Sequence, residues 1–147
     1  MSTNQVSQNA ADMFSAGYNC AQAVLHANCE RLQFDKNVAL KVATGFGAGI
    51  AREGEVCGAV TGGVMAISLR YGRAGGEDRS KTEETYTKTK EFMDRFKQRH
   101  GSLTCRELIG CDLGTPEGQK YFKENDLLHR TCAPCVQTAS ELVDAAI

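Results

Sequence analysis

Apolar residues recur at helical spacing along nearly all of this 147-residue chain, and this pattern most constrains the possible fold. No segment alternates apolar and polar residues with the period of two that a half-buried strand requires. Only two prolines interrupt the pattern, and 41% hydrophobic with 24% charged residues is typical of a globular domain. We therefore predict an all-α fold, in which residues 1–147 form a single-domain bundle of about six to eight helices.

Capping residues and glycines mark the expected helix starts and ends. Ser80 with Glu83 matches a capping box before a long charged helix that ends near His100. The other predicted starts are Asn19, Asp35 or Lys36, Val56 or Cys57, Thr104, Thr115 and Thr131. The helix that begins near Cys57 has a face of small residues, so we expect it to pack closely against a neighbour, within or between subunits.

Four of the seven cysteines lie where these helices begin: Cys20, Cys57, Cys105 and Cys132. A helix N-terminus presents unpaired N–H groups and the positive end of the helix dipole, which favours a thiolate over a thiol. Metals, clusters and disulfide exchange all require thiolates. The sequence therefore indicates sulfur chemistry.

The N-terminal sequence, the longest apolar stretch and the net charge indicate where the protein is located and which partners it can bind. The N-terminus has no secretory signal, and the longest apolar stretch, Val56 to Leu69, is too short to span a bilayer. We therefore expect a cytoplasmic protein without membrane insertion, in which thiols stay reduced. A formal net charge of −1 provides no basic surface for nucleic acid.

An iron–sulfur cluster held by Cys20, Cys57, Cys105 and Cys132 is the first interpretation of the cysteines. These residues are far apart in sequence, but the starts of several helices can gather at one end of a bundle. Nearby glycines would let backbone N–H groups approach the cluster sulfides. The glycines predicted for this role are Gly45, Gly47, Gly49, Gly58 and Gly62.

Two other interpretations stay open. A structural zinc ion would use Cys105 with Cys111 and Cys132 with Cys135, although the first pair is widely spaced for a zinc knuckle. A metal-free redox dithiol would use Cys132 as the nucleophile and Cys135 as the resolving thiol, but no βαβ pattern surrounds this CxxC motif.

Further cysteines and histidines have simpler explanations. Cys29 is expected to be a small buried residue, whereas Cys111 and Cys135 fit either a buried or a functional role. His26 is expected at the core or its rim, and His100 at a helix end. His129, three residues before Cys132, is a candidate for a fourth ligand or a proton donor.

Four ordered motifs resemble the C_GCAxxG_C_C family of redox-active proteins. They are Tyr18-Asn19-Cys20, Cys57-Gly58-Ala59-Val60-Thr61-Gly62, Cys105 through Cys111-Asp112-Leu113, and Cys132-Ala133-Pro134-Cys135. The resemblance covers residues 7–145 and implies that the four shared cysteines are Cys20, Cys57, Cys105 and Cys132. Cys111 recurs in many relatives and is the reserve ligand. Cys135 stands where the family commonly has an aromatic residue, which leaves the fourth ligand open.

Taken together, these observations predict a redox protein whose iron–sulfur cluster serves electron transfer or redox sensing. We expect its partner to be another redox protein and allow for a homo-oligomer. No acid–base dyad or nucleophile–histidine pair stands out, so the sequence assigns no enzymatic activity.

Overall fold

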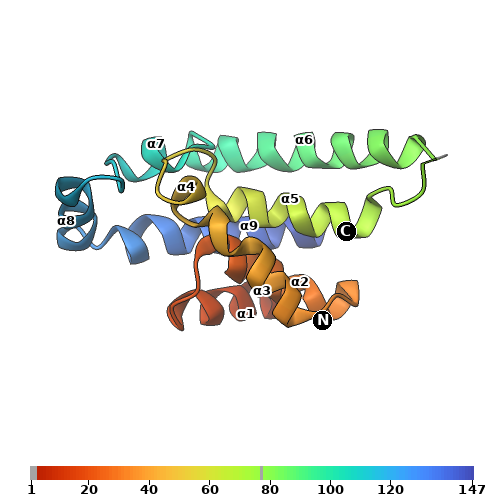
Figure 1. Ribbon diagram of the computed structural model, residues 1–147, viewed down its shortest axis with the longest axis horizontal. Coiled ribbons are helices and arrows are strands. Elements are labelled where there is room, and N and C mark those ends of the chain that lie inside the picture. Colours follow the sequence, from red (N-terminus) through yellow and green to blue (C-terminus); the bar gives the residue numbers. More distant parts are fainter. Residues whose placement is uncertain (1–2, 77) are drawn as a thin grey trace.

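The computed structural model describes residues 3–76 and 78–147 and contains helices and connecting loops (Figure 1). Across these residues the sole extended pairing is an isolated antiparallel bridge between Val56 and Thr104. The main helices are α1 (Thr3–Ser15), α2 (Cys20–Leu32), α3 (Lys36–Ala43), α5 (Gly58–Tyr71), α6 (Ser80–His100), α7 (Cys105–Ile109), α8 (Pro116–Glu124) and α9 (Ala133–Ala146). Three short segments join them: η1 (Thr44–Phe46), α4 (Gly47–Ile50) and η2 (Leu128–Cys132). The all-α prediction is confirmed.

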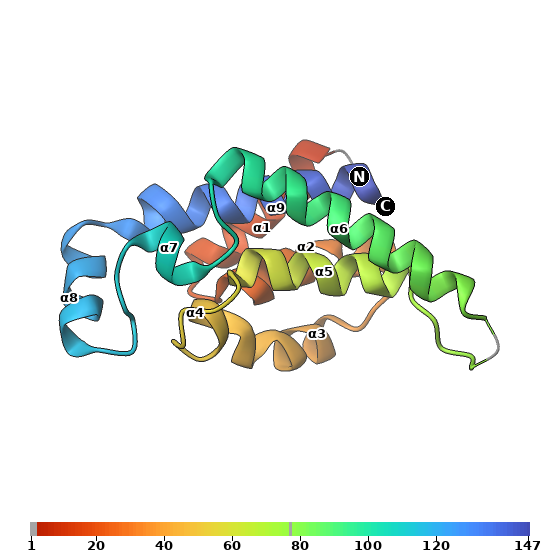
Figure 2. The ribbon, with the colours of Figure 1, turned by 90° about the horizontal axis from the view of Figure 1, so that it is seen from above.

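Helix α2 lies at the centre of the bundle and packs against α1, α3, α5 and α9. The long helix α6 covers α5 and α9 from the opposite side (Figures 1 and 2). Buried apolar side chains from α1, α2, α5, α6 and α9 form one continuous core. Its largest fully buried members include Phe92, Phe96, Leu25 and Ile67.

Three of the packed helices begin at the same end of the molecule. Helices α2, α5 and α9 all start near α4, α7 and α8, and both chain ends lie toward the opposite end (Figures 1 and 2). This arrangement brings residues from remote parts of the sequence together at the α7–α8 end. It is the feature of the fold that positions the candidate site.

Local sequence explains where most helices begin. The Asn19 side chain accepts from the N–H of Gln22, whose own side chain accepts from the N–H of Asn19, which completes a capping box. Asp35 caps α3 through the N–H of Val38. The capping box predicted for Ser80 and Glu83 is wrong, because Ser80 is already helical and its hydroxyl donates to Asp78 instead.

The small-residue face of α5 packs inside the chain. A Cβ atom on Gly62 would lie 2.7 Å from the carbonyl oxygen of Ala21 in α2, and one on Gly63 would overlap the Phe92 ring of α6. Glycine therefore lets α5 fit between α2 and α6 at short range. Because this face is covered within one chain, it does not provide an oligomer interface.

None of the helices in the described residues combines the length and the hydrophobicity that a bilayer-spanning helix requires.

Candidate functional site

Five cysteines line one cavity of about 270 Å³ at the α7–α8 end: Cys20, Cys57, Cys105, Cys132 and Cys135. The first four are those at the predicted helix starts, so the structure brings together sulfurs from four distant segments. The rest of the lining is mostly apolar, and no Asp, Glu, Lys, Arg or His is among the lining residues. The cavity is therefore rich in thiols and poor in charge.

Gly58 explains how Cys57 comes to lie beside Cys20. A Cβ atom at Gly58 would be 3.0 Å from the backbone nitrogen of Ala21 and 3.1 Å from the Cβ of Cys20. The absence of a side chain therefore lets the first turn of α5 rest on the first turn of α2. The glycines of the Cys57–Gly62 motif act through this close helix contact.

Backbone hydrogen bonds bring Cys105 next to Cys57. The N–H of Cys57 donates to the carbonyl of Leu103 at 2.8 Å, and the N–H of Cys105 donates to the carbonyl of Glu55 at 2.7 Å. The two segments thus pair in an antiparallel manner around the Val56–Thr104 bridge. This pairing joins the start of α5 to the start of α7.

A left-handed turn of backbone forms another part of the cavity wall. Residues 48–52 all have positive φ, between 51° and 70°, although only Gly49 among them is glycine. Such a conformation costs a non-glycine residue about 1–2 kcal/mol, so the surrounding contacts must hold it in place. Gly49 supplies one of them, because its carbonyl accepts from the N–H of Glu55 at 2.9 Å.

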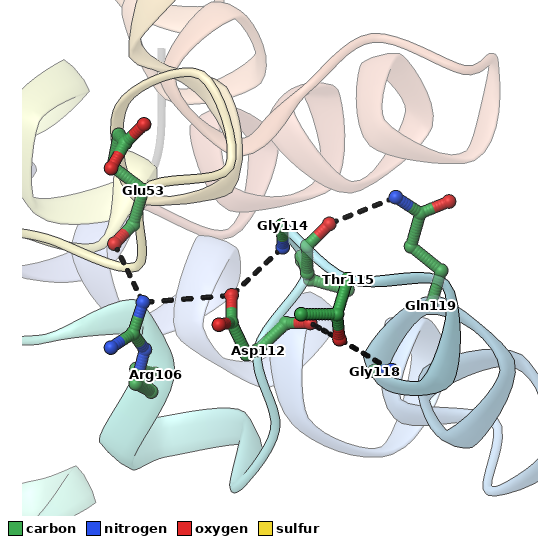
Figure 3. Close-up of polar contacts among 8 residues, drawn as sticks. Glu53, Arg106, Asp112, Gly114, Thr115, Gly118 and Gln119 are labelled. Carbon is green, nitrogen blue, oxygen red and sulfur yellow. Dashed lines mark hydrogen bonds and ion pairs between the residues drawn. The ribbon is translucent and has the colours of Figure 1, made fainter.

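Arg106 ties the loop that follows this turn to the α7–α8 connection (Figure 3). Its guanidinium donates to the carbonyl of Glu53 at 3.2 Å and lies 3.5 Å from the carboxylate of Asp112. Asp112 in turn accepts from the N–H of Gly114, and its carbonyl accepts from the hydroxyl of Thr115. This polar network lies outside the cavity and fixes the segments that form its wall.

Cys132 occupies a different position from the one predicted. Thr131 does not cap a new helix, because η2 is a π-helical turn that runs directly into α9 with Cys132 already helical (φ −70°, ψ −43°). Cys132 therefore lacks the free helix N-terminus that was expected to favour its thiolate. π-Helical turns often accompany functional sites, and this one delivers Cys132 to the cavity.

The cavity thiols shift one another's pKa values. A hydrogen bond with Cys132 is the main cause that raises the pKa of Cys20 well above its ordinary value. A hydrogen bond with Cys135 lowers the pKa of Cys57, and the N–H groups of Ala59 and Val60 act in the same direction. The same contact, together with burial, raises the pKa of Cys135.

The pKa of Cys105 is shifted for a different main reason. Burial is the main cause that raises its pKa to about 12, and repulsion from Cys57 and Cys132 adds to it. Several thiolates at once would thus repel each other in an apolar cavity with no cationic side chain in its lining. Bound cations are one means of balancing such charge.

Among the described residues, no group of three or more His, Cys, Asp or Glu side chains has an arrangement that could hold a metal ion. A tetrahedral zinc site brings its sulfur ligands to ~2.3 Å from one point. Of the four cysteines in the zinc interpretation, Cys105, Cys132 and Cys135 line the cavity and Cys111 does not.

Several other predicted site residues lie outside the cavity lining. Cys111 is half-buried and absent from the lining, although it lies near enough to Cys105 to influence its pKa. Of the five predicted glycines, Gly49 and Gly58 line the cavity. Gly47 packs against the Asn19 side chain and Gly62 against Ala21, whereas a Cβ atom on Gly45 would meet no atom within 4 Å.

The remaining candidates have local partners. Cys29 is buried and its thiol donates to the carbonyl of Leu25, as expected of a structural residue. His100 contacts the hydroxyl of Thr138 at 2.9 Å. His129 is exposed and lies 2.7 Å from Asp126, outside the cavity lining, so its predicted role as a ligand gains no support.

Sequence reasoning placed Cys135 in the zinc and dithiol alternatives but not among the cluster ligands, and it did not identify the apolar wall of the cavity. Cys135 is 1% exposed and lines the cavity. Its spacing of three residues from Cys132 on a helix was a usable signal, because such residues share one face. The apolar wall comes mainly from Phe14, Leu108, Ile109, Leu113, Phe122 and Leu128.

Comparison with known proteins places this arrangement in a family. An alignment 98 positions long, which covers 61% of the chain, is 33% identical to an uncharacterized protein of Archaeoglobus fulgidus and spans 64% of that protein. No solved structure matches. A family model matches residues 18–146, which include all five cavity cysteines. The chain therefore belongs to the family described as "Putative redox-active protein (C_GCAxxG_C_C)".

Proposed function

We propose that this protein is a redox protein whose cavity binds an iron–sulfur cluster through Cys20, Cys57, Cys105 and Cys132. The observation that carries the proposal is the lining of the cavity: five thiols from remote segments and no charged side chain. A bound cluster would supply one-electron chemistry at this position.

The properties of the cavity support a polynuclear group over a single ion. Its volume of about 270 Å³ far exceeds the roughly 10–15 Å³ that a cavity needs to hold one water molecule. Thiols that surround such a space can each hold a different atom of a cluster. Cations bound among the thiolates would relieve their mutual repulsion.

The surrounding residues would control the properties of the bound group. Phe122, Leu113 and Leu128 contribute apolar surface that limits access of water, and solvent exposure and burial are among the factors that set the potential of a cluster. Gly49 and Gly58 place backbone without a side chain at the wall. All seven cysteines are free, which suits a reducing compartment such as the cytoplasm.

Anaerobic purification of single-cysteine variants tests the proposal. We expect the unmodified protein to absorb visible light and to contain iron and acid-labile sulfide. Cys20→Ser, Cys57→Ser, Cys105→Ser and Cys132→Ser should each lose most of the iron and the colour, because each removes one ligand. The matched control is Cys29→Ser, a buried thiol outside the cavity, which should keep both.

Three results would contradict the cluster. A protein that contains stoichiometric zinc and no sulfide would support the zinc-stabilised module. A colourless, metal-free protein with an oxidisable Cys132–Cys135 pair would support the dithiol oxidoreductase. Retention of full iron and sulfide by all four variants would remove these residues as ligands.

A further inference from the structure

We propose that a groove beside the thiol cavity binds a small organic anion with an aromatic body, such as an aromatic carboxylate. This groove, called the α8 groove below, has a volume of about 400 Å³. Its lining consists of three apolar side chains, from Leu113, Phe122 and Leu128, and four polar ones, from Arg52, Gln119, Lys123 and Asp126. The proposal does not rest on the iron–sulfur cluster.

The size and the apolar side of the groove suit a small aromatic molecule. Sites for small molecules commonly have volumes of about 300–1,000 Å³ and pair apolar walls with a few polar groups. All three apolar side chains, from Leu113, Phe122 and Leu128, also line the thiol cavity, so the two spaces adjoin. An aromatic ring in the groove would therefore cover apolar surface immediately beside the thiols.

The parts of the chain that form the groove are joined by local contacts. Gln119, Phe122 and Lys123 are three and four residues apart, which places them on one face of α8. The Gln119 side chain donates to the carbonyl of Leu113 at 2.9 Å and so reaches back over the α7–α8 connection (Figure 3). A Cβ atom on Gly114 in this connection would lie 3.4 Å from the carbonyl oxygen of Arg52. The groove is therefore already formed in the protein without a ligand.

The charges in the lining favour an anion. Within residues 3–76 and 78–147, neither the guanidinium of Arg52 nor the ammonium of Lys123 has a hydrogen-bond or ion-pair partner. Asp126 is the one acidic residue among the described lining residues, and its carboxylate lies 2.7 Å from Nδ1 of His129. Two cations without a partner thus face one carboxylate that already has one. Such a local excess of positive charge attracts anionic ligands.

The backbone at Arg52 points in the same direction. Arg52 is the last residue of the left-handed turn at residues 48–52 and has φ 70°. Non-glycine residues in this conformation cluster at active sites and at sites that clamp ligands. The turn borders the thiol cavity at Ala48 and the α8 groove at Arg52, so one strained segment contributes to both.

Equilibrium dialysis of the full-length, anaerobically purified protein against 2-naphthoate tests the proposal. We expect saturable binding at one site. The neutral amide with the same rings, 2-naphthamide, should bind at least about four-fold more weakly, because it loses the attraction of two exposed cations. Added sodium chloride should weaken the binding of 2-naphthoate. Inorganic phosphate at the same concentration should not displace it, because phosphate has no apolar body.

Charge variants locate the site. Arg52→Gln and Lys123→Gln should each weaken the binding of 2-naphthoate by about two- to five-fold, as expected for one exposed ion pair. Arg52→Lys keeps the charge and should keep most of the affinity. Asp126→Asn should strengthen binding, and asparagine tolerates the φ of 51° at this position.

Lys120→Gln is the matched control. It removes the same charge from the same helix, but Lys120 lies outside the groove lining and pairs with Glu124 at 3.8 Å. Its effect on binding should stay below about 1.5-fold, because solvent and salt screen an exposed charge that does not contact the ligand.

Four results would overturn the proposal. They are the absence of saturable binding at millimolar 2-naphthoate, equal affinity for 2-naphthamide, displacement by phosphate, and a loss with Lys120→Gln as large as that with Arg52→Gln and Lys123→Gln. None of these results affects the cluster, which is tested separately by the iron and sulfide content of the same preparations.

Discussion

Gly49 and Cys105 lie so close together that a Cβ atom on Gly49 would be 2.7 Å from the Cβ of Cys105. The same atom would be 2.7 Å from the backbone nitrogen of Glu55. The left-handed turn at residues 48–52 therefore rests directly on the start of α7. The position of Cys105 in the cavity depends on this contact.

Gly49→Ala should destabilise the protein by about 2–5 kcal/mol. An alanine at φ +64° costs about 1–2 kcal/mol, and the clash with Cys105 and Glu55 adds about 1–3 kcal/mol. Urea unfolding of the reduced, metal-free protein, followed by circular dichroism, measures the loss. Gly45→Ala is the matched control, because its Cβ meets no atom within 4 Å, and it should stabilise the protein by about 0.4–1 kcal/mol by restricting the unfolded chain. Equal unfolding midpoints for the two variants would contradict the packing argument.

Ala51→Gly should stabilise the protein, which is unusual for this substitution. Ala51 has φ 51° and ψ 40°, where glycine avoids a cost of about 1–2 kcal/mol. The greater freedom of glycine in the unfolded chain offsets about 0.4–1 kcal/mol, so we expect a net gain of about 0.5–1 kcal/mol. The control is Ala11→Gly inside α1, which should lose about 1 kcal/mol in the same urea experiment. A loss at both positions would show that the turn stores no such strain.

Asn19→Ala should lower the free energy of unfolding by about 1–2 kcal/mol. The Asn19 side chain caps α2 through the N–H of Gln22 at 2.9 Å and also donates to the carbonyl of Thr44 at 2.9 Å. Asn19→Ser keeps a capping oxygen but cannot make both contacts. Its stability should therefore lie between that of the unmodified protein and that of Asn19→Ala. If serine were no better than alanine, the cap would contribute nothing. Thermal unfolding of the three proteins compares them.

Acidification should destabilise the fold through His26 and His100. Burial is the main cause that lowers the pKa of both side chains, and Lys36 and Arg99 respectively add to it. Because the folded state binds a proton less readily than the unfolded state, stability is full above the unfolded pKa of about 6.5 and falls as the pH drops below it.

Urea midpoints between pH 7.5 and pH 5.5 measure this effect. The double variant with His26→Gln and His100→Gln should show a flatter dependence on pH over that range. His129→Gln is the control, because this exposed side chain pairs with Asp126 at the surface, and it should leave the slope due to His26 and His100 in place. If the double variant keeps the full dependence of the urea midpoint on pH, other titratable groups must cause it.

The helices themselves were largely predictable from the sequence. Apolar residues such as Phe92 and Phe96 recur at helical spacing because one face must be buried, and Asn19 and Asp35 cap their helices by contacts within three residues. These causes are local, so a single sequence records them. The failures were local as well: Ser80 found another partner in Asp78, and Thr131 lies in a π-helical turn that continues into α9.

The residues that line the cavity were harder to predict. Helix starts singled out Cys20, Cys57, Cys105 and Cys132, and this reasoning omitted Cys135, which also lines the cavity. The argument from glycines assigned Gly62 to a cofactor, but Gly62 packs against α2. Spacing along the chain does not tell whether a residue on a helix faces a cavity or a neighbouring helix. Gly62 faces α2 because α5 and α2 cross at that point.

The sequence by itself determined the all-α class, most helix starts, the supply of thiols and the family pattern. Only the tertiary structure decided which sulfurs meet, because that depends on which helices begin at the same end of the bundle. The contacts that set this arrangement join residues far apart in the chain, such as Gly58 with Cys20 and Cys105 with Glu55. Their free energy arises only when the helices pack, so no local pattern records it.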